Sequence, residues 1–128
     1  LLEKDYTPII STVGLDSKYN AFNINADDVA TGVARALKAS KLVFLTDIEG
    51  VLRNPSDPST RISVINTESA AELFEQGIIT GGMIPKLKNC LEAVQEDVKK
   101  VHILDGRLEH SLLIEIFTTS GVGTEIKK

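Results

Sequence analysis

Two short, mainly apolar runs place the strongest limit on how this chain can fold. Lys41–Thr46 reads Lys-Leu-Val-Phe-Leu-Thr, and Val101–Leu104 reads Val-His-Ile-Leu. Such runs are typical of strands covered on both faces, as in parallel sheets. Before the first run, apolar residues recur at steps of three and four from Asp27 to the region of Lys38, which predicts an amphipathic helix. Helices alternating with buried strands predict an α/β fold, a three-layer αβα sandwich with a mainly parallel sheet.

The remaining patterns extend this alternation along the whole chain. β-Branched residues predict a first strand at Thr7–Thr12. Asn25 or Asp27 would cap the helix that follows. Further on we expect a strand at Ile62–Ile65, a helix with a Ser69–Glu72 capping box that ends at Gly77, a helix beginning near Pro85, a helix at Ser111–Phe117 and a strand at Gly123–Ile126. No linker divides these elements, so residues 1–128 are expected to form a single domain.

Composition excludes several classes of function. The formal net charge of -4 argues against a basic surface for nucleic acid. The longest apolar runs are far shorter than the roughly 20 residues that cross a bilayer, so we expect no membrane association and a cytoplasmic location.

Cys90 is the single cysteine, and its apolar, helical setting favours a buried, unreactive thiol over a nucleophile. The chain opens without an initiator Met, and Leu1–Asp5 resembles the end of a helix, which suggests a start in mid-protein.

Polar or glycine-rich clusters stand at four of the joints between predicted strands and helices. In open α/β sheets, ligands bind at the carboxyl ends of the strands, so these clusters together predict one site. Each alone also has a structural explanation, as a helix cap, a tight turn or a solvated surface. The clusters are Asn23-Ile-Asn25-Ala-Asp27, Thr46-Asp47-Ile-Glu-Gly50, Gly81-Gly82-Met-Ile-Pro-Lys86 and Asp105-Gly106-Arg107.

The glycine pair before the third predicted helix suits a phosphate. Gly81 and Gly82 expose backbone N–H groups at the positive end of the helix dipole, although a simple turn explains them equally well. Lys86 lies one turn into that helix, where the dipole disfavours a cation, so an anionic partner would explain its position. No Walker-type loop is present. The two histidines lack metal-ligand spacing with Cys90, and we predict no protein-bound metal.

These four clusters, in their order and spacing, resemble the carboxyl-terminal half of the acetylglutamate kinases, a branch of the amino-acid kinase family. The resemblance covers nearly the whole chain. The Thr-Asp-x-x-Gly-Val element marks the wider family, whereas the Asn-x-Asn-Ala-Asp and Gly-Gly-Met-Ile-Pro-Lys elements are specific to this branch. It is carried by Asn23–Asp27, Leu45–Val51, Gly81–Lys86 and Ile103–Arg107, followed by His110–Glu115 and Gly121–Thr124.

The resemblance implies phosphoryl transfer from ATP, with Mg²⁺, to the side-chain carboxylate of N-acetyl-L-glutamate in arginine biosynthesis. It implies that Lys86 contacts the γ-phosphate, that Asp27 orients the catalytic lysines and that Asn23 binds the acetylglutamate. It also implies a nucleotide site that consists of Thr46, Asp47, Gly82, Met83 and Lys86. Family members are homo-oligomers, dimers or hexamers, and some respond to arginine or to a PII protein.

Two departures from the family pattern qualify this interpretation. No amino-terminal half with its Gly-Gly segment and second lysine precedes Leu1, so we expect the chain to fold but not to turn over substrate. Glu125 stands where the family has an apolar residue, which affects the expected arginine-feedback region. Two alternatives stay open: a sister kinase that acts on a related acid, and a nucleotide- or effector-binding module without catalysis.

Overall fold

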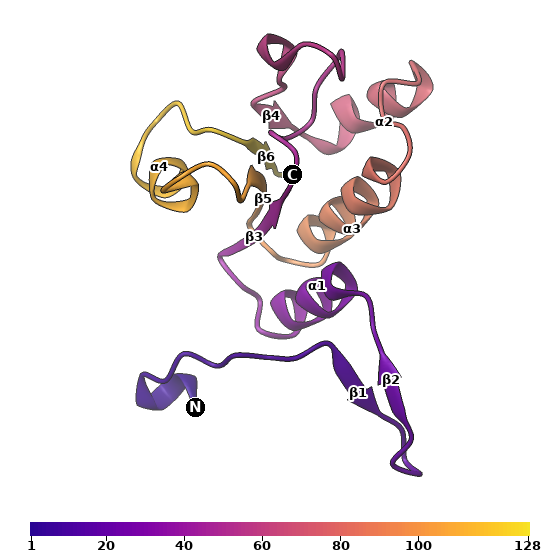
Figure 1. Cartoon of the computed structure of the whole chain (residues 1–128), viewed down its shortest axis with the longest axis vertical. Helices are drawn as coiled ribbons and strands as arrows, with labels where there is room; N and C mark the ends of the chain where they lie inside the picture. The colour runs from indigo at the N-terminus through magenta and orange to yellow at the C-terminus, as the bar shows by residue number, and fades with distance from the viewer.

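A computed structural model describes the whole chain, residues 1–128, and its centre is a four-stranded sheet (Figure 1). The strands lie in the order β3 (Lys41–Thr46), β5 (Lys100–Asp105), β6 (Thr124–Ile126) and β4 (Val64–Ile65). β3 is parallel to β5 and β4 is parallel to β6, while β5 and β6 are antiparallel. The sheet is therefore mixed but mostly parallel, as the apolar runs predicted.

Helices cover both faces of this sheet. α1 (Ala26–Ala36) and α3 (Met83–Gln95) contact each other, and they contact β3, β5 and β6 on one face. α4 (Ser111–Phe117) lies on the opposite side of β5 (Figure 1). The other helical elements are α2 (Thr67–Glu75) and two 3₁₀ turns, η1 (Leu2–Lys4) and η2 (Pro58–Thr60). The predicted three-layer arrangement is confirmed.

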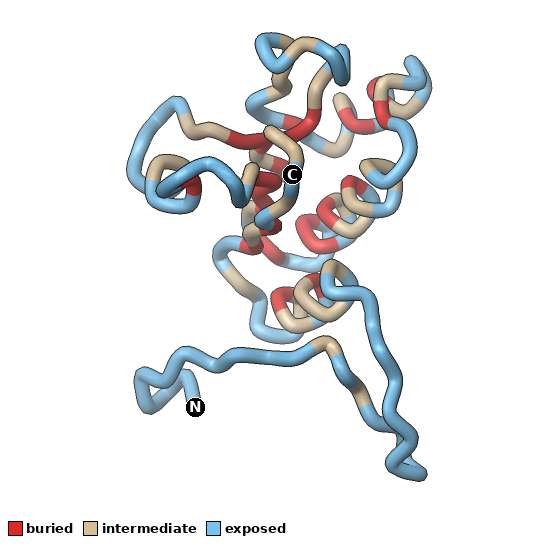
Figure 2. The backbone as a smooth tube through the Cα atoms, viewed as in Figure 1, coloured by how far each residue is buried: buried red, intermediate tan, exposed pale blue.

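The core lies between the sheet and α3. Leu87, Cys90 and Val94 lie on one stripe of α3 and are fully buried against Ile103 of β5 and Ile126 of β6. Figure 2 shows this buried region concentrated in the middle of the molecule. Burying one large aliphatic side chain contributes about 1.5 to 3 kcal/mol, so this stripe fixes α3 on the sheet. It also fixes the position of the polar residues at the start of α3.

Capping residues define most helix ends as the sequence predicted, but two predicted helix starts, those of α2 and α3, were wrong. Asn25 caps α1 by accepting hydrogen bonds from the N–H groups of residues 27 and 28, as predicted. The Ser69–Glu72 capping box is wrong: α2 begins one turn earlier, because the box is formed by Asn66 and Ser69. Gly77 has φ +68° and ends α2 as expected. Pro85 is the third residue of α3 rather than the first, still in the turn where its missing N–H costs nothing.

The amino-terminal segment departs most from the sequence prediction. The strand predicted at Thr7–Thr12 is wrong: these residues form no sheet, and Ile9 is 98% exposed. The first strands are instead β1 (Val13–Leu15) and β2 (Ala21–Asn23), an antiparallel hairpin that projects from the α/β body (Figure 1). A β-branched run becomes a strand only beside a neighbouring strand, and no neighbour is available to Thr7–Thr12 within these residues.

No helix of the structure has both the length and the apolar character that crossing a membrane requires.

Candidate functional site

A pocket of about 420 Å³ opens where the carboxyl end of β3 meets the amino end of α3. Three chain segments form its wall: the turn after β3, the loop before η2, and the turn that leads into α3. Its lining residues are Thr46, Asp47, Ile48, Gly50, Val51, Leu52, Pro55, Ile78, Ile79, Thr80, Gly82, Met83 and Lys86. All five residues of the expected nucleotide site are therefore brought together in one pocket.

The turn after β3 is held by its own side chains. Thr46 Oγ1 accepts a hydrogen bond of 3.0 Å from the N–H of Ile48, which folds the chain back beside the end of the strand. Asp47 follows directly and lines the pocket. Gly50 has φ +118°, a conformation that a residue with a side chain rarely adopts. The turn thus presents one carboxylate and bare backbone to the pocket.

The amino end of α3 forms the opposite wall. Gly82 is the N-cap residue and Gly81 before it has φ +54°, so the helix starts abruptly from the turn. No side chain caps this end, but the N–H groups of Met83 and Ile84 donate to the carbonyls of Thr80 and Gly81, and Pro85 has no N–H. What lies beside the pocket at Gly82 and Met83 is therefore the positive end of the helix dipole rather than a set of free N–H donors. The arrangement suits an anionic group of a ligand.

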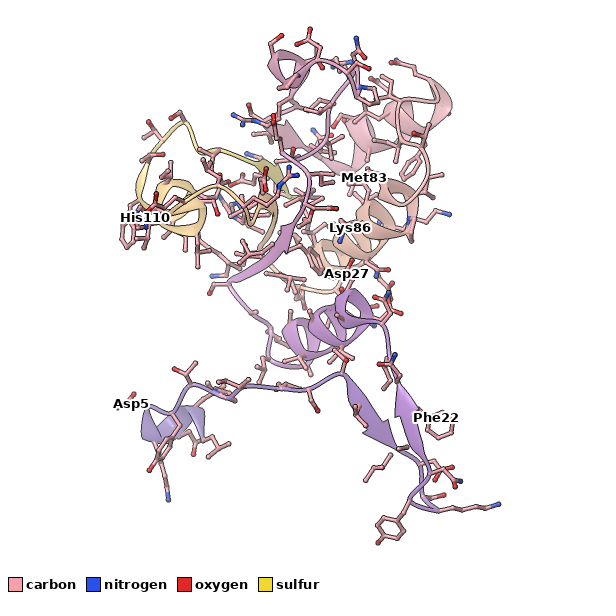
Figure 3. The ribbon with its side chains drawn as sticks, viewed as in Figure 1. Asp5, Phe22, Asp27, Met83, Lys86 and His110 are labelled. Atoms are coloured by element: carbon pink, nitrogen blue, oxygen red, sulfur yellow. The ribbon has the colours of Figure 1, made fainter.

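Lys86 joins this pocket to α1. Its ammonium group donates to Oδ2 of Asp27 at 2.5 Å, and the two side chains are only 18% and 31% exposed. The same nitrogen lies 5.3 Å from the centre of the Phe44 ring, within the range of a cation–π interaction. Figure 3 shows Asp27 and Lys86 facing each other between the two helices. Lys86 is thus a positioned cation rather than a freely moving surface lysine.

Two predicted site residues, Asn23 and Asp27, do not line the pocket, although Asp27 is paired with Lys86, which does. Asn23 lies at the end of β2, opposite Val13, and is exposed. In the same cluster Asn25 caps α1, as the structural interpretation predicted, and Asp27 forms an ion pair with Lys86.

The fourth cluster forms a turn. Asp105 accepts hydrogen bonds from the backbone N–H and the guanidinium of Arg107, and these contacts lower the pKa of the Asp105 carboxyl. The N–H of Gly106 donates to the carbonyl of Thr46 at 2.7 Å, which ties this turn to the end of β3. Neither Asp105 nor Arg107 lines the pocket. The Asp105–Arg107 turn therefore contacts the end of β3, which lines the pocket, without lining the pocket itself.

Cys90 has no reactive role. It is fully buried, and burial raises the pKa of its thiol to about 12, although the nearby charge of Lys86 acts in the opposite direction. Cys90 is therefore buried as predicted, and because the thiolate is the nucleophilic form, we expect it to be unreactive in the folded chain.

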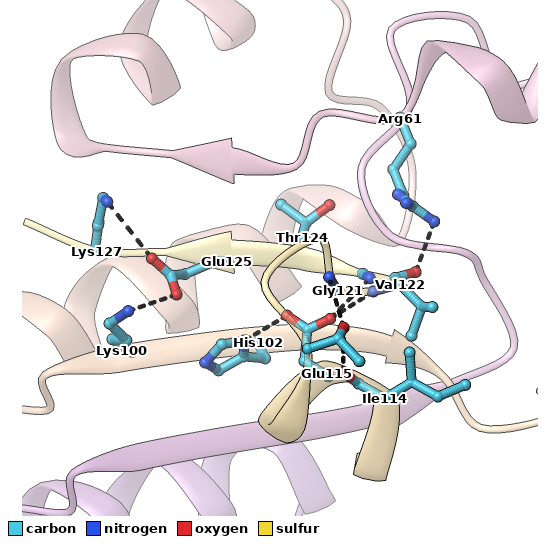
Figure 4. Close-up of polar contacts among 12 residues, drawn as sticks. Arg61, Lys100, His102, Ile114, Glu115, Gly121, Val122, Thr124, Glu125 and Lys127 are labelled. Atoms are coloured by element: carbon cyan, nitrogen blue, oxygen red, sulfur yellow. Dashed lines mark hydrogen bonds and ion pairs between the residues drawn. The ribbon is translucent and has the colours of Figure 1, made fainter. Parts of the chain in front are cut away.

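A second, polar pocket of about 360 Å³ lies between β5, β6 and the loop after α4. Its centre is a buried pair in which Nδ1 of His102 lies 2.8 Å from Oε1 of Glu115 (Figure 4). Burial raises the pKa of Glu115, but hydrogen bonds from the N–H of Val122, from His102 and from the N–H of Gly123 outweigh it and leave this pKa lowered. Nε2 of His102 is buried without a partner.

Glu125 extends this pocket. Its carboxylate accepts a hydrogen bond of 2.8 Å from Lys100, and Lys127 lies 3.6 Å away. Burial raises its pKa, but the hydrogen bond and charge of Lys100 outweigh burial and lower it below the ordinary value. A carboxylate at this position, which the sequence marked as a departure, is therefore accommodated by two lysines.

Sequence reasoning gave no site role to several lining residues, among them Leu52, Pro55 and Ile78–Thr80. Ile78–Thr80 precede the Gly81–Gly82 pair, and their contribution could have been read from their closeness to it. Pro55 belongs to a turn-rich segment that gave no functional signal at all. Both segments reach the pocket because the chain folds back over β3, which no local pattern encodes.

The fold and the pocket together define an α/β protein with a pocket at the carboxyl end of β3, beside a helix amino end and a paired lysine. The chain belongs to the amino acid kinase family, whose model matches residues 1–105. It is 52% identical over 124 residues to the acetylglutamate kinase of Methanosarcina acetivorans, and 53% identical over 126 residues to that of Persephonella marina. These matches cover 97% and 98% of this chain but only 42% and 41% of those relatives.

A solved structure shares the fold at a lower identity. N-acetylglutamate synthase from Neisseria gonorrhoeae, complexed with coenzyme A and L-arginine, superposes with a TM-score of 0.84 at 31% identity. The match covers 93% of this chain and 27% of that protein. The fold is therefore shared with a protein of a different name, so fold alone does not specify the reaction.

Proposed function

We propose that this chain is the nucleotide-binding part of an acetylglutamate kinase. The whole enzyme would transfer the γ-phosphoryl group of ATP to the side-chain carboxylate of N-acetyl-L-glutamate, in the cytoplasm. The observation that carries the proposal is the convergence of Thr46, Asp47, Gly82, Met83 and Lys86 on one pocket, in a chain about half identical to enzymes of that name.

Phosphoryl transfer needs charge neutralisation and alignment more than it needs covalent chemistry by the protein. Lys86 would contact the γ-phosphate and stabilise the charge that develops on the moving group. Asp27 would hold the Lys86 ammonium in place, as their short ion pair suggests. Removing one preorganised donor of this kind costs about 3 kcal/mol of transition-state stabilisation, so the Lys86→Ala enzyme should lose about two orders of magnitude in kcat.

Mg²⁺ would enter as part of the MgATP substrate. The chain has no cluster of three or more His, Cys, Asp or Glu side chains that could hold a metal ion. Mg²⁺ in nucleotide sites is commonly held by phosphate oxygens and water with only one or two carboxylates. Asp47 is the carboxylate that lines this pocket.

The acetylglutamate site would need more protein than these residues supply. The chain spans about two fifths of the length of its relatives. Asn23 would bind the substrate from the exposed hairpin, once another part of the protein covers that hairpin. We therefore propose that the chain alone binds nucleotide without turnover, and that the whole enzyme is a homo-oligomer, dimeric or hexameric, with arginine or a PII protein as regulators.

Calorimetric titration of MgATP into the chain tests the proposed nucleotide site. We expect binding that weakens in both Lys86→Ala and Asp47→Ala, whereas Lys88→Ala should bind like the wild type. Lys88 is the matched control because it lies on the same helix but is exposed and outside the pocket. Binding that is unaffected by Lys86→Ala and Asp47→Ala would place the nucleotide elsewhere. Competition of N-acetylglutamate with 2-aminoadipate and glutamate in the longer enzyme would separate the acetylglutamate kinase from a sister kinase.

A second candidate function is arginine binding in the pocket around His102. Its support is the L-arginine in the related synthase complex and a polar pocket with two carboxylates, Glu115 and Glu125. Lys100 already pairs with Glu125, so a guanidinium would have to replace this cation. A guanidinium suits carboxylates geometrically as well as electrically. Titration with L-arginine, with L-lysine as the control ligand, should show binding that Glu125→Gln weakens. Equal heats for both ligands, or none, would remove this candidate.

A further inference from the structure

Thr124 lies in the central part of the fold, yet its side chain serves the turn that forms the pocket. It is fully buried on β6, opposite Ile103 of β5. Its hydroxyl accepts a hydrogen bond of 2.8 Å from the N–H of Val51 and donates one of 2.8 Å to the carbonyl of Ile62. One side chain therefore satisfies two backbone groups from two different loop segments.

Val51 is clamped from both sides by these contacts. Its N–H is bound by Thr124, and its carbonyl accepts a hydrogen bond of 2.8 Å from the N–H of Ile62. Val51 also lines the pocket and closes the turn that starts at Asp47. The far end of the turn is thus fixed to β6, while its near end is fixed by β3.

Gly50 lies directly against the same threonine. A Cβ atom at Gly50 would fall 2.6 Å from Oγ1 of Thr124 and 3.3 Å from its backbone nitrogen. Two consecutive residues that line the pocket are therefore set by contact with Thr124, one through a hydrogen bond and one through close packing.

The strand that carries Thr124 is itself held firmly. The N–H groups of Val122 and Gly123 donate to Glu115 at 2.7 and 3.1 Å, and Arg61 donates to the carbonyl of Val122 at 2.7 Å (Figure 4). Glu125 follows and pairs with Lys100. Contacts on both sides of Thr124 along the chain leave its hydroxyl little freedom to shift.

We propose that Thr124 is a positioning residue for nucleotide binding: its hydroxyl holds the 47–51 turn in the shape that receives the ligand. It touches no ligand itself and acts through Val51 and Gly50. This inference rests on the proposed function for its ligand, MgATP. The sequence gives no hint of the role, because residue 124 is 73 positions from Val51 and looks like an ordinary strand residue.

Removing the hydroxyl separates this role from simple packing. Thr124→Val keeps the β-branched shape but leaves the N–H of Val51 and the carbonyl of Ile62 without their partner in a buried place. Buried unpaired groups are costly, so the turn should relax toward conformations that pair them elsewhere. We expect the Kd for MgATP to rise about tenfold, which corresponds to about 1.4 kcal/mol. Thr124→Ser retains the hydroxyl and should restore most of the affinity.

The test combines calorimetry with amide hydrogen exchange on this chain. Calorimetry compares the wild type, Thr124→Val, Thr124→Ser and the control Ile126→Val, which removes one buried methyl group from the same strand without touching the turn. Exchange of the Val51 amide, followed without nucleotide, should be slow in the wild type and in Thr124→Ser but fast in Thr124→Val.

Each outcome bears on the inference. Weaker MgATP binding and faster Val51 exchange in Thr124→Val alone would support it. Unchanged affinity in Thr124→Val, no rescue by serine, or an equal loss in Ile126→Val would overturn it. If the wild-type chain binds no MgATP, the proposed nucleotide site fails, and the Val51 exchange rates still decide whether Thr124 holds the turn.

Discussion

The ion pair between Lys86 and Asp27 should be energetically coupled, because it lies largely out of water. The perturbation is a double-mutant cycle with Asp27→Asn and Lys86→Met, made singly and together. These replacements remove one charge each while keeping much of the side-chain volume. The cycle isolates the pairwise interaction from the separate effects of each substitution.

The structure sets the expected size of the coupling. Exposed pairs contribute roughly 0.2 to 1 kcal/mol, whereas removing one partner of a fully buried pair costs about 3 to 5 kcal/mol. Lys86 and Asp27 are 18% and 31% exposed, and their charged atoms are 2.5 Å apart, which places the pair between these limits. We expect a coupling of about 1 to 2 kcal/mol, only partly reduced in 1 M salt because partly buried pairs are weakly screened.

The assay is urea unfolding of the four proteins at neutral pH. A second cycle on Arg35 and Glu92 serves as the control, since this pair joins the same two helices at 2.6 Å but is 32% and 51% exposed. We expect about 0.5 kcal/mol for it. A coupling for Lys86 and Asp27 within the usual additivity error of about 0.5 kcal/mol would refute the argument that burial makes this pair special.

Three further results are expected. Gly50→Ala should lower the free energy of unfolding by about 1 to 3 kcal/mol in urea titrations, because Gly50 has φ +118° and the new Cβ would collide with Thr124. Gly32→Ala is the control: Gly32 lies in a helix with open space around it, so this change should not lower the stability of the fold. Cys90 should react with a thiol reagent at pH 8 only after unfolding, because burial raises its pKa to about 12, and rapid labelling of the folded chain would contradict this. The lowered pKa of Glu115 stabilises the fold above its ordinary value of 4.5, and this contribution is lost as pH falls through the folded value. Acid unfolding curves should therefore show the stability gap between wild type and Glu115→Gln narrowing below pH 4.5, and a constant gap would argue against it.

The sequence pattern predicted some of the residues that line the pocket but not others, and the physical reason differs between them. Thr46 ends an apolar strand and Asp47 follows it, so local pattern placed these two residues at the carboxyl edge of a sheet. Gly82 and Lys86 open a helix that follows another helix, so the position of that helix beside β3 was not given by local pattern. Pro55 was not predicted, because its turn-rich segment has no periodicity and no motif that marks it as part of a site.

The amino-terminal residues show where pattern reasoning fails. Thr7–Thr12 has the composition of a strand, but strand formation depends on a partner strand, and hydrogen-bond partners are not encoded in composition. The predicted capping box of α2 was wrong by one turn, because the box that forms pairs the N–H groups of Asn66 and Ser69 rather than those of Ser69 and Glu72.

Sequence by itself determined the α/β class and most elements of the α/β body, because apolar runs and helical spacing reflect local backbone preferences and burial; it did not determine the β1–β2 hairpin. Tertiary structure alone decided which distant groups meet. The Lys86–Asp27 pair joins residues 59 positions apart, and the Thr124–Val51 hydrogen bond joins residues 73 positions apart. Each contact depends on how separate elements pack, α1 against α3 in one case and β6 against the turn after β3 in the other. Their energies depend on that packing, because it excludes water from the charged and polar atoms.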